Sequence, residues 1–401
     1  MSYESLRNLR YRKPDEWQAE YNRRYNSETA VLLNFSIHDK PAFYLETPEL
    51  LKQIIKMQRI DKQIHELVIK LPGESVNQFT RRCLIDEIVI TNNIEGVNST
   101  RREIEDILSE LESKNKTKRF YGLVKKYCML LLNDSISIGC SRDIRDIYNE
   151  LVLPEVLSDS PEDAPDGEIF RKESVSVYSP TGKELHCGVN PESKIIEYMD
   201  NAIDFLNNSE SEMLFKISVF HYIFGYIHPF YDGNGRTSRF ISSYLLSKCF
   251  EPAIAFRLSY TIKENIKEYY ESFKICNDRF NMGDITPFVY MFFDIIEKSL
   301  YQLNEALEKR YQMFKHYIGH IYLLPNFDTY GELYSLLIQA ALFSERGIST
   351  KELIEILSVS RTTAANRLKA INSDLLNKDK IGIENYYSLN LQTFDNIIMK
   401  K

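Results

Sequence analysis

The residues best suited to chemistry form one continuous stretch, His228-Pro229-Phe230-Tyr231-Asp232-Gly233-Asn234-Gly235-Arg236-Thr237-Ser238-Arg239. Pro229 predicts the end of the apolar helix before it. Gly233 and Gly235 permit backbone angles that turn peptide N–H groups inward, and a helix expected to begin near Thr237 adds the partial positive charge of its first turn. The stretch therefore predicts a nest for an anion.

The side chains of this stretch suit a bound polyphosphate. Arg236 and Arg239 can each donate paired hydrogen bonds to phosphate oxygens. Asp232 is the one acid of the loop, and a lone carboxylate beside phosphates suits Mg²⁺. His228 stands at the mouth of the nest, where an imidazole can take a proton from a hydroxyl near neutral pH. We expect Phe230 to anchor the loop on the core. A lone histidine or one G-x-G would be ordinary structure, but this combination has no evident packing rationale.

The stretch resembles the Fic family motif H-x-F-x-(D/E)-G-N-G-R-x-x-R at every defined position. The resemblance implies a helical core with a β-hairpin flap that binds ATP and Mg²⁺ and usually transfers AMP to Ser, Thr or Tyr hydroxyls of target proteins. In relatives the same loop can hold other phosphate-bearing donors. The resemblance implies that His228 is the catalytic base and Asp232 the Mg²⁺ ligand. It also implies that Gly233, Asn234 and Gly235 form the phosphate cradle and that Arg236 and Arg239 clamp the phosphates.

A second, looser similarity concerns the nucleoside. Tyr269, Tyr270 and Asn277 resemble the spacing of the family's nucleoside-pocket residues, on the helix after the motif's own helix. Adjacent tyrosines are also common in cores and on surfaces, so this alternative stays open.

Upstream, helical periodicity runs into Thr91-Asn92-Asn93-Ile94-Glu95-Gly96, where the glycine predicts a helix end. Glu95 at a helix C-terminus opposes the macrodipole, so we expect a cationic partner. The segment resembles the inhibitory motif (S/T)-x-x-x-E-(G/N) of some Fic proteins, which implies that Glu95 pairs with Arg239 and leaves ATP in an unproductive pose. The alternatives are a solvated helix end, or a mobile Glu95 that helps water remove AMP from a modified target.

The remaining pattern predicts a mainly α protein. Apolar residues recur three and four positions apart in most segments. Ser174–Tyr178 alternates like a strand, Ser179–Gly182 reads as a turn, and Glu184–His186 returns, which predicts a β-hairpin at the position of the flap. Such a flap could align an extended segment of the protein substrate by strand addition. An ordinary edge hairpin is the alternative.

The C-terminal region resembles a winged helix-turn-helix. A short helix is expected over Ile348–Leu357, a second over Arg361–Ile371, and a hairpin after Lys378. The second helix carries Arg361, Arg367 and Lys369 and no acid, which suits contacts with DNA phosphates. The balance of charges over the whole region is close to neutral, which favours protein docking or a homodimer as the alternative.

Bulk properties bound the remaining possibilities. A chain of 401 residues predicts two or three domains, here 1–104 with the inhibitory segment, 105–320 as catalytic core and 321–401 as winged helix. The net charge of −7 argues against a surface that is basic everywhere, and the six cysteines form no short C-x-x-C pairs. No export signal or membrane segment is expected, so the protein is expected in the cytoplasm. A regulator that senses nucleotide and binds DNA is the rival from another functional class.

Overall fold

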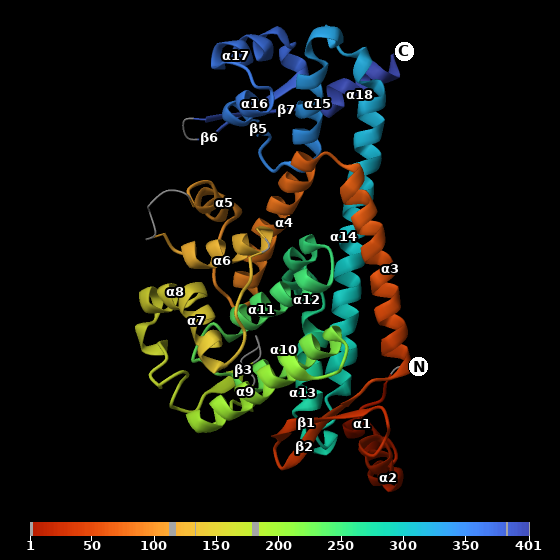
Figure 1. Ribbon diagram of the computed structural model, residues 1–401, viewed down its shortest axis with the longest axis vertical. Helices are drawn as coiled ribbons and strands as arrows, with labels where there is room; N and C mark the ends of the chain where they lie inside the picture. The colour runs from red at the N-terminus through yellow and green to blue at the C-terminus, as the bar shows by residue number, and fades with distance from the viewer. Residues whose placement is uncertain (1–2, 112–117, 133, 179–183, 382–383, 401) are drawn as a thin grey trace. The chain divides into compact units, whose positions relative to one another are not determined.

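The computed structural model describes the chain except residues 1–2, 112–117, 133, 179–183, 382–383 and 401. The described part is mainly α-helical, with small antiparallel sheets (Figure 1). Its residues group into two compact units, Met1–Asp61 with Leu84–Tyr301, and Lys62–Cys83 with Gln302–Lys401. The long helices α3 (Pro48–Lys70), α4 (Gly73–Ile94) and α14 (Thr286–His320) contribute residues to both units.

The first unit contains the loop His228–Arg239. Its further helices are α1 (Leu6–Arg12), α2 (Pro14–Tyr25), α5 (Arg101–Ser109), α6 (Tyr121–Leu131), α7 (Ser141–Leu151), α8 (Leu153–Asp159), α9 (Glu192–Asn208), α10 (Met213–Ile227), α11 (Asn234–Cys249), α12 (Leu258–Glu264) and α13 (Ile266–Cys276). Its short 3₁₀ segments are η1 (Pro161–Asp163), η2 (Pro252–Phe256) and η3 (Arg279–Asn281). Its strands are β1 (Ala30–Ile37), β2 (Lys40–Leu45), β3 (Ser176–Tyr178) and β4 (Glu184–Cys187), which pair as β1 with β2 and β3 with β4.

Helix α10 is the central element of this unit. It packs against α9 on one side and α11 on another, and apolar residues on all its faces are buried. Its buried polar residue His221 is satisfied at both ring nitrogens, by Ser242 Oγ at 2.8 Å and Tyr269 Oη at 2.8 Å. His228 directly follows the last residue of this helix, Ile227, which is fully buried. In the described part of the chain no helix is both long and apolar enough to cross a membrane.

The N-terminal residues pack on the same unit as the loop, although the sequence suggests a separate region ending near residue 104. Phe43 on β2 exchanges backbone hydrogen bonds with Gly283 (3.0 Å) and Ile285 (2.9 Å). The buried carboxylate of Asp284 accepts from Tyr3 at 2.5 Å and pairs with Arg24 at 3.2 Å. A buried acid bound by two N-terminal side chains explains why the first residues join this unit.

The last turns of α4 are held on the core in a similar way. Glu87 is fully buried, and its carboxylate accepts hydrogen bonds from the backbone N–H of Ser259 at 3.0 Å and the Ser259 hydroxyl at 2.5 Å. Burial raises the pKa of Glu87 to about 7, and the hydrogen bonds from Ser259 oppose this rise. Because Glu87 lies two helical turns before Glu95, this contact sets the direction from which Glu95 approaches α11.

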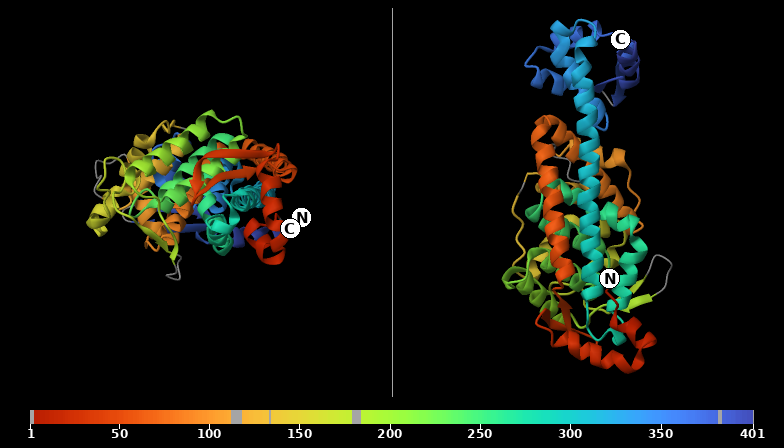
Figure 2. Two further views of the ribbon diagram at one scale, coloured as in Figure 1. Left: turned by 90° about the horizontal axis from the view of Figure 1, so that it is seen from below. Right: turned by 90° about the vertical axis from the view of Figure 1, so that its right-hand side faces the viewer.

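The first half of α3 runs beside the first half of α14, as Figures 1 and 2 show. Gln53 donates to Asp294 at 2.9 Å, and Lys56 pairs with Glu297. These polar contacts line the outer edge of an otherwise apolar seam that includes Leu50.

The expected flap hairpin is present as β3 and β4, with Val177 opposite His186. The expected turn, Ser179–Gly182, lies outside the described residues.

The second unit contains η4 (Ile321–Leu323), α15 (Phe327–Phe343), α16 (Thr350–Ile356), α17 (Arg361–Ala370), η5 (Ser373–Leu375) and α18 (Leu391–Met399), with strands β5 (Ile348–Ser349), β6 (Leu376–Ile381) and β7 (Glu384–Leu389). Helix α16 begins with a capping box, in which Ser349 accepts from the N–H of Glu352 at 3.1 Å and Glu352 accepts in return at 2.7 Å. The strands pair antiparallel in the order β5-β7-β6.

Candidate active site

The loop between α10 and α11 is held by local geometry. His228 follows α10 with a left-handed backbone (φ 54°), and Gly233 precedes α11 with φ 78°. Helix α11 begins at Asn234, earlier than the expected start near Thr237, because the Asn234 side chain bonds across the loop. It donates to the Phe230 carbonyl at 2.8 Å and accepts from the Phe230 N–H at 2.9 Å. The first turn of α11 therefore includes Asn234, Gly235 and Arg236, and its free N–H groups lie within the loop.

Phe230 anchors the loop on the core, as expected. Its side chain is fully buried and stacks on Tyr148 with ring centroids 3.8 Å apart. Phe170 packs edge-on against Phe230, with ring centroids 5.5 Å apart. Aromatic packing on both faces thus keeps the loop in one position.

Arg236 is buried between two carboxylates. Its guanidinium is 1% exposed and bonds to Glu155 on α8 at 2.7 Å and to Asp232 at 3.1 Å. Its Nε is buried and lacks a hydrogen-bond partner among the described residues. Asp232 is half exposed, with 46% of its side chain accessible, so its carboxylate still has room for another cation.

Arg239 points toward the end of α4. Its Nε donates to Thr91 Oγ1 at 2.9 Å, its Nη2 donates to the Thr91 carbonyl at 3.0 Å, and Nη2 pairs with Glu95 at 2.7 Å. Gly96 (φ 75°) ends the helix, where Val97 N–H donates to Asn92 O at 3.0 Å. Burial acts to lower the pKa of Arg239, but the charge and hydrogen bond of Glu95 together with Tyr269 and Tyr270 outweigh burial and raise that pKa.

Gly235 shows where the Glu95 carboxylate lies. A Cβ atom added to Gly235 would overlap that carboxylate and would lie 2.8 Å from Arg239 Nη1. The acid therefore sits directly over the first turn of α11, on the surface that offers N–H groups and guanidinium nitrogens to an anion.

His228 is a neutral imidazole at physiological pH. Burial, followed by the neighbouring His186 and Arg171, lowers its pKa to about 3, although a hydrogen bond with the backbone of Gly225 acts in the opposite direction. A neutral imidazole can accept a proton, which is the chemical requirement for a general base.

The three residues expected to form a nucleoside pocket lie on or at the end of α13. Burial raises the pKa of Tyr269 and of Tyr270, and both hydroxyls feel the charges of Glu95 and Arg239, so both lie near the loop. Asn277 is buried, and its side-chain oxygen accepts a hydrogen bond from the Tyr222 hydroxyl at 2.6 Å. Its role in a nucleoside pocket stays a prediction.

A Mg²⁺ ion fits this donor set through Asp232. Within the described residues no three His, Cys, Asp or Glu side chains form a cluster that could hold a metal. Mg²⁺ keeps several waters and takes oxygen ligands from a bound polyphosphate. A single accessible carboxylate, beside groups that donate hydrogen bonds to phosphate, therefore suits this ion.

Two contributors could not be recognised from sequence. Glu155 is 8% exposed and bonds Arg236, and Arg171 is fully buried behind His228. The available signal was weak: Glu155 is one acid in a short Pro-containing segment, and Arg171 precedes the expected hairpin.

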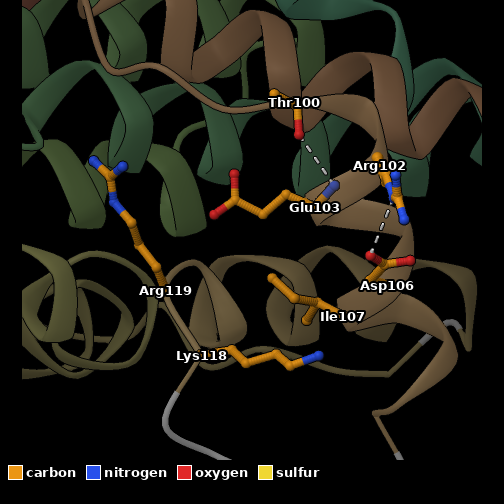
Figure 3. A pocket seen from close by; sticks show the side chains of 7 residues that line it. All are labelled: Thr100, Arg102, Glu103, Asp106, Ile107, Lys118 and Arg119. Carbon is orange, nitrogen blue, oxygen red and sulfur yellow. Dashed lines mark hydrogen bonds and ion pairs between the residues drawn. The ribbon is translucent and has the colours of Figure 1, made fainter.

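The structure also has a pocket of about 360 Å³ that involves α5 (Figure 3). It is lined by Thr100, Arg102, Glu103, Asp106, Ile107, Lys118 and Arg119, and by none of the predicted site residues. Its cations already have partners, since Lys118 pairs with Glu110 at 2.7 Å and Arg119 with Asp159 at 2.8 Å. We therefore assign no ligand to it.

Comparison with known proteins agrees with the loop geometry. Residues 140–246 match the model of the Fic/DOC family. This segment of the chain thus resembles a Fic/DOC family domain. A protein adenylyltransferase Fic of Drosophila willistoni is 37% identical over 100 residues, which are 24% of this chain and 18% of that protein. The Drosophila ananassae protein of the same name is 27% identical over 231 residues, 56% of this chain and 43% of its own length. The matched segment therefore spans less than half of these relatives.

A solved structure shares the fold. The crystal structure of a Fic family protein from Desulfovibrio desulfuricans G20 superposes with a TM-score of 0.51 at 18% sequence identity, covering 86% of this chain and 97% of that one. The mainly α-helical fold with small antiparallel sheets is thus Fic-like.

Proposed function

We propose that the protein is a protein adenylyltransferase, which transfers AMP from ATP to a Ser, Thr or Tyr hydroxyl of a target protein. The observation that carries the proposal is the convergence of Arg236, Arg239 and the first turn of α11 directly after the neutral imidazole of His228. Buried guanidinium groups beside free N–H groups bind polyphosphate, and a base beside them can activate a hydroxyl. The family match over residues 140–246 supports the same chemistry.

In the proposed reaction, His228 takes the proton of the target hydroxyl while its oxygen attacks the α-phosphorus of ATP. The bond from the α-phosphorus to the bridging oxygen breaks, and pyrophosphate leaves. The N–H groups of α11 and the two arginines stabilise the negative charge that develops. Mg²⁺ held by Asp232 and water would neutralise charge on the β- and γ-phosphates. A bound triphosphate would raise the pKa of His228 from about 3 toward the range in which a base is most effective.

We further propose that Glu95 restrains this activity. Its carboxylate occupies Arg239 at 2.7 Å and lies over Gly235, so it competes with a phosphate for the same donors. ATP that binds while Glu95 is in place must take a different pose, which lowers the productive fraction. A displaced Glu95 could instead orient water for removal of AMP, which is the reverse activity of the same site.

The flap supplies a surface for the protein substrate. In the described part, β3 and β4 pair only with each other, so each strand has an outer edge that can add an extended peptide. Gly188 N–H donates to Val175 O at 2.8 Å and joins the base of the flap close to His228. A hydroxyl side chain of a docked segment would then face the imidazole.

Donor labelling tests the proposed reaction. The Glu95→Gly variant is incubated with Mg²⁺, candidate target proteins from host lysate, and ATP labelled at the α- or the γ-phosphate. Label from the α-phosphate on protein, lost in the Glu95→Gly, His228→Ala double variant, supports AMP transfer. Label from the γ-phosphate alone would instead identify transfer of a phosphate, and transfer only from another phosphate-bearing donor would identify that donor.

A second candidate function, DNA binding, is favoured by the second unit. The strand order β5-β7-β6, with α16 and α17 between β5 and β6, resembles that of a winged helix-turn-helix and supports this candidate. Arg361, Asn366 and Lys369 on α17 are exposed, and this helix carries no acid. The test is whether the protein binds its own upstream DNA specifically and whether the His228→Ala variant retains that binding. If the molecular mass in solution rises with protein concentration and no DNA is bound, the unit would instead be assigned to homodimer formation.

A further inference from the structure

Arg171 is a buried cation whose role the proposed reaction does not yet explain. Its side chain is fully buried directly before the flap. No carboxylate of the described residues forms an ion pair with it, and burial lowers the pKa of Arg171. A buried, uncompensated guanidinium is costly, so it is retained for the hydrogen bonds that it makes.

These hydrogen bonds all go to backbone carbonyls. Nε donates to His228 O at 2.8 Å, and Nη2 donates to Ile227 O at 3.3 Å. Nη2 also donates to Val189 O at 2.8 Å, and Nη1 donates to Glu173 O at 2.5 Å. Ile227 and His228 form the end of α10, whereas Glu173 and Val189 flank the two strands of the flap. One guanidinium therefore joins the peptide of the proposed base to both ends of the flap.

We propose that Arg171 is a positioning residue, which holds the backbone of His228 in its left-handed conformation and keeps the flap in register with the imidazole. Two observations support this assignment. His228 has φ 54°, which a residue with a side chain adopts only when surrounding contacts hold it there. The carbonyl of that same residue accepts from Arg171 Nε.

The chemistry requires arginine at this position. A guanidinium presents five N–H donors in a rigid plane, while an ammonium is a compact point charge with three donors. Four carbonyls from three chain segments surround the guanidinium and leave little space around it. A Cβ added to Gly188 would lie 2.5 Å from Arg171 Nη2 and 3.2 Å from His228 Cβ. Gly188→Ala should therefore displace the guanidinium without removing it.

The charge of Arg171 gives a readout that does not depend on transfer activity. Burial, His186 and Arg171 lower the pKa of the His228 imidazole, in that order. Replacing Arg171 by alanine removes one of these causes, so the pKa of His228 should rise, whereas lysine preserves the charge. The imidazole signal is followed by NMR during a pH titration and is assigned with His228→Ala.

The kinetic arm of the test rests on the proposed adenylyl transfer and uses the Glu95→Gly background. Arg171→Lys is expected to lower kcat about 100-fold while the KM for ATP stays within about threefold, because a displaced base affects the reaction more than nucleotide binding. Gly188→Ala should behave like Arg171→Lys. Added guanidinium ions should restore part of the kcat of Arg171→Ala and leave Arg171→Lys unchanged.

A matched control is Arg145→Lys. Arg145 is also partly buried and donates to a backbone carbonyl, that of Ile169 at 2.6 Å, and it should stay within about twofold of its parent. Failure of the Glu95→Gly parent itself to transfer AMP would count against the proposed function, and the NMR titration would still decide the role of Arg171. The positioning role is overturned by full kcat in Arg171→Lys and Gly188→Ala, or by an unchanged His228 pKa in Arg171→Ala.

Discussion

Under the proposed function, in which Glu95 and a nucleotide phosphate compete for Arg239, replacing Glu95 by glycine should raise the rate of AMP transfer. A hydrogen-bonded contact with a charged partner contributes about 1.5–3 kcal/mol. The Glu95 side chain is 25% exposed, so the lower half of that range, about 1.5–2 kcal/mol, is appropriate. At 1.4 kcal/mol for each factor of ten, the productive fraction of bound ATP should rise about 10- to 30-fold.

The structure indicates that this substitution spares Arg239 itself. Thr91 still accepts from Nε and Nη2 of Arg239, at 2.9 and 3.0 Å, so the guanidinium keeps its position when the carboxylate is removed. Glu95→Gln preserves the shape of the side chain without its charge and should give a smaller rise. The assay measures the initial rate of α-phosphate label transfer to protein at saturating ATP and Mg²⁺.

The control is Asn93→Gly, which places a glycine at an exposed residue of the same last turn of α4. It should stay within about twofold of the wild type, since it loosens the helix end without removing the acid. Equal rates for the wild type and Glu95→Gly would refute the competition. An equal rise in Asn93→Gly would show that helix fraying, and not the carboxylate, controls the rate.

Three further predictions concern the core and the metal. The buried His221 has its pKa lowered to about 3, chiefly by burial. His221 is neutral in the folded protein, whereas in the unfolded chain it protonates below about pH 6.5. Its contribution to the free energy of unfolding is therefore fully present above about pH 6.5 and is lost as the pH falls toward 3, at about 1.4 kcal/mol per pH unit. Urea unfolding of His221→Gln should show a shallower pH dependence than the wild type, and equal slopes would contradict this. Glu155→Gln leaves the buried Arg236 without its closest carboxylate and should lower the free energy of unfolding by about 3 kcal/mol. Glu168→Gln changes an acid whose side chain is 79% exposed and whose partner Arg142 is 52% exposed, and it should cost less than about 1 kcal/mol. Similar losses would contradict the burial argument. Asp232→Asn should lower Mg²⁺-dependent transfer about 100-fold, while calorimetry shows metal-free ATP binding within about threefold of the wild type. Unchanged transfer would remove Asp232 as the metal ligand.

The candidate site was predictable where its chemistry is contiguous. His228, Asp232 and the two arginines lie in one loop, and the glycines that shape it stand beside them, so residue types and spacing define an anion nest before any fold is known. The start of α11 was harder to predict from the sequence. Its position at Asn234 depends on two side-chain hydrogen bonds to Phe230, which compete with the generic preference for a helix start at Thr237.

Contacts between distant segments could not be inferred from spacing. Glu155 meets Arg236 across 81 residues, and Arg171 meets His228 across 57. The grouping of the N-terminal residues with the helices around the loop likewise depends on the buried Asp284, far along the chain from Tyr3 and Arg24.

By itself, the amino-acid sequence determined the helical class, the hairpin and the set of groups that can hold a polyphosphate beside a base, because periodicity, glycine freedom and side-chain chemistry are local properties. Only the tertiary structure decided which charges are buried, which carboxylate lies over Gly235, and which guanidinium holds the peptide of His228. Those outcomes depend on the packing of α4, α8 and the flap against α10 and α11. Burial strengthens the interaction between a charge and its partner, because the dielectric constant around buried groups is low.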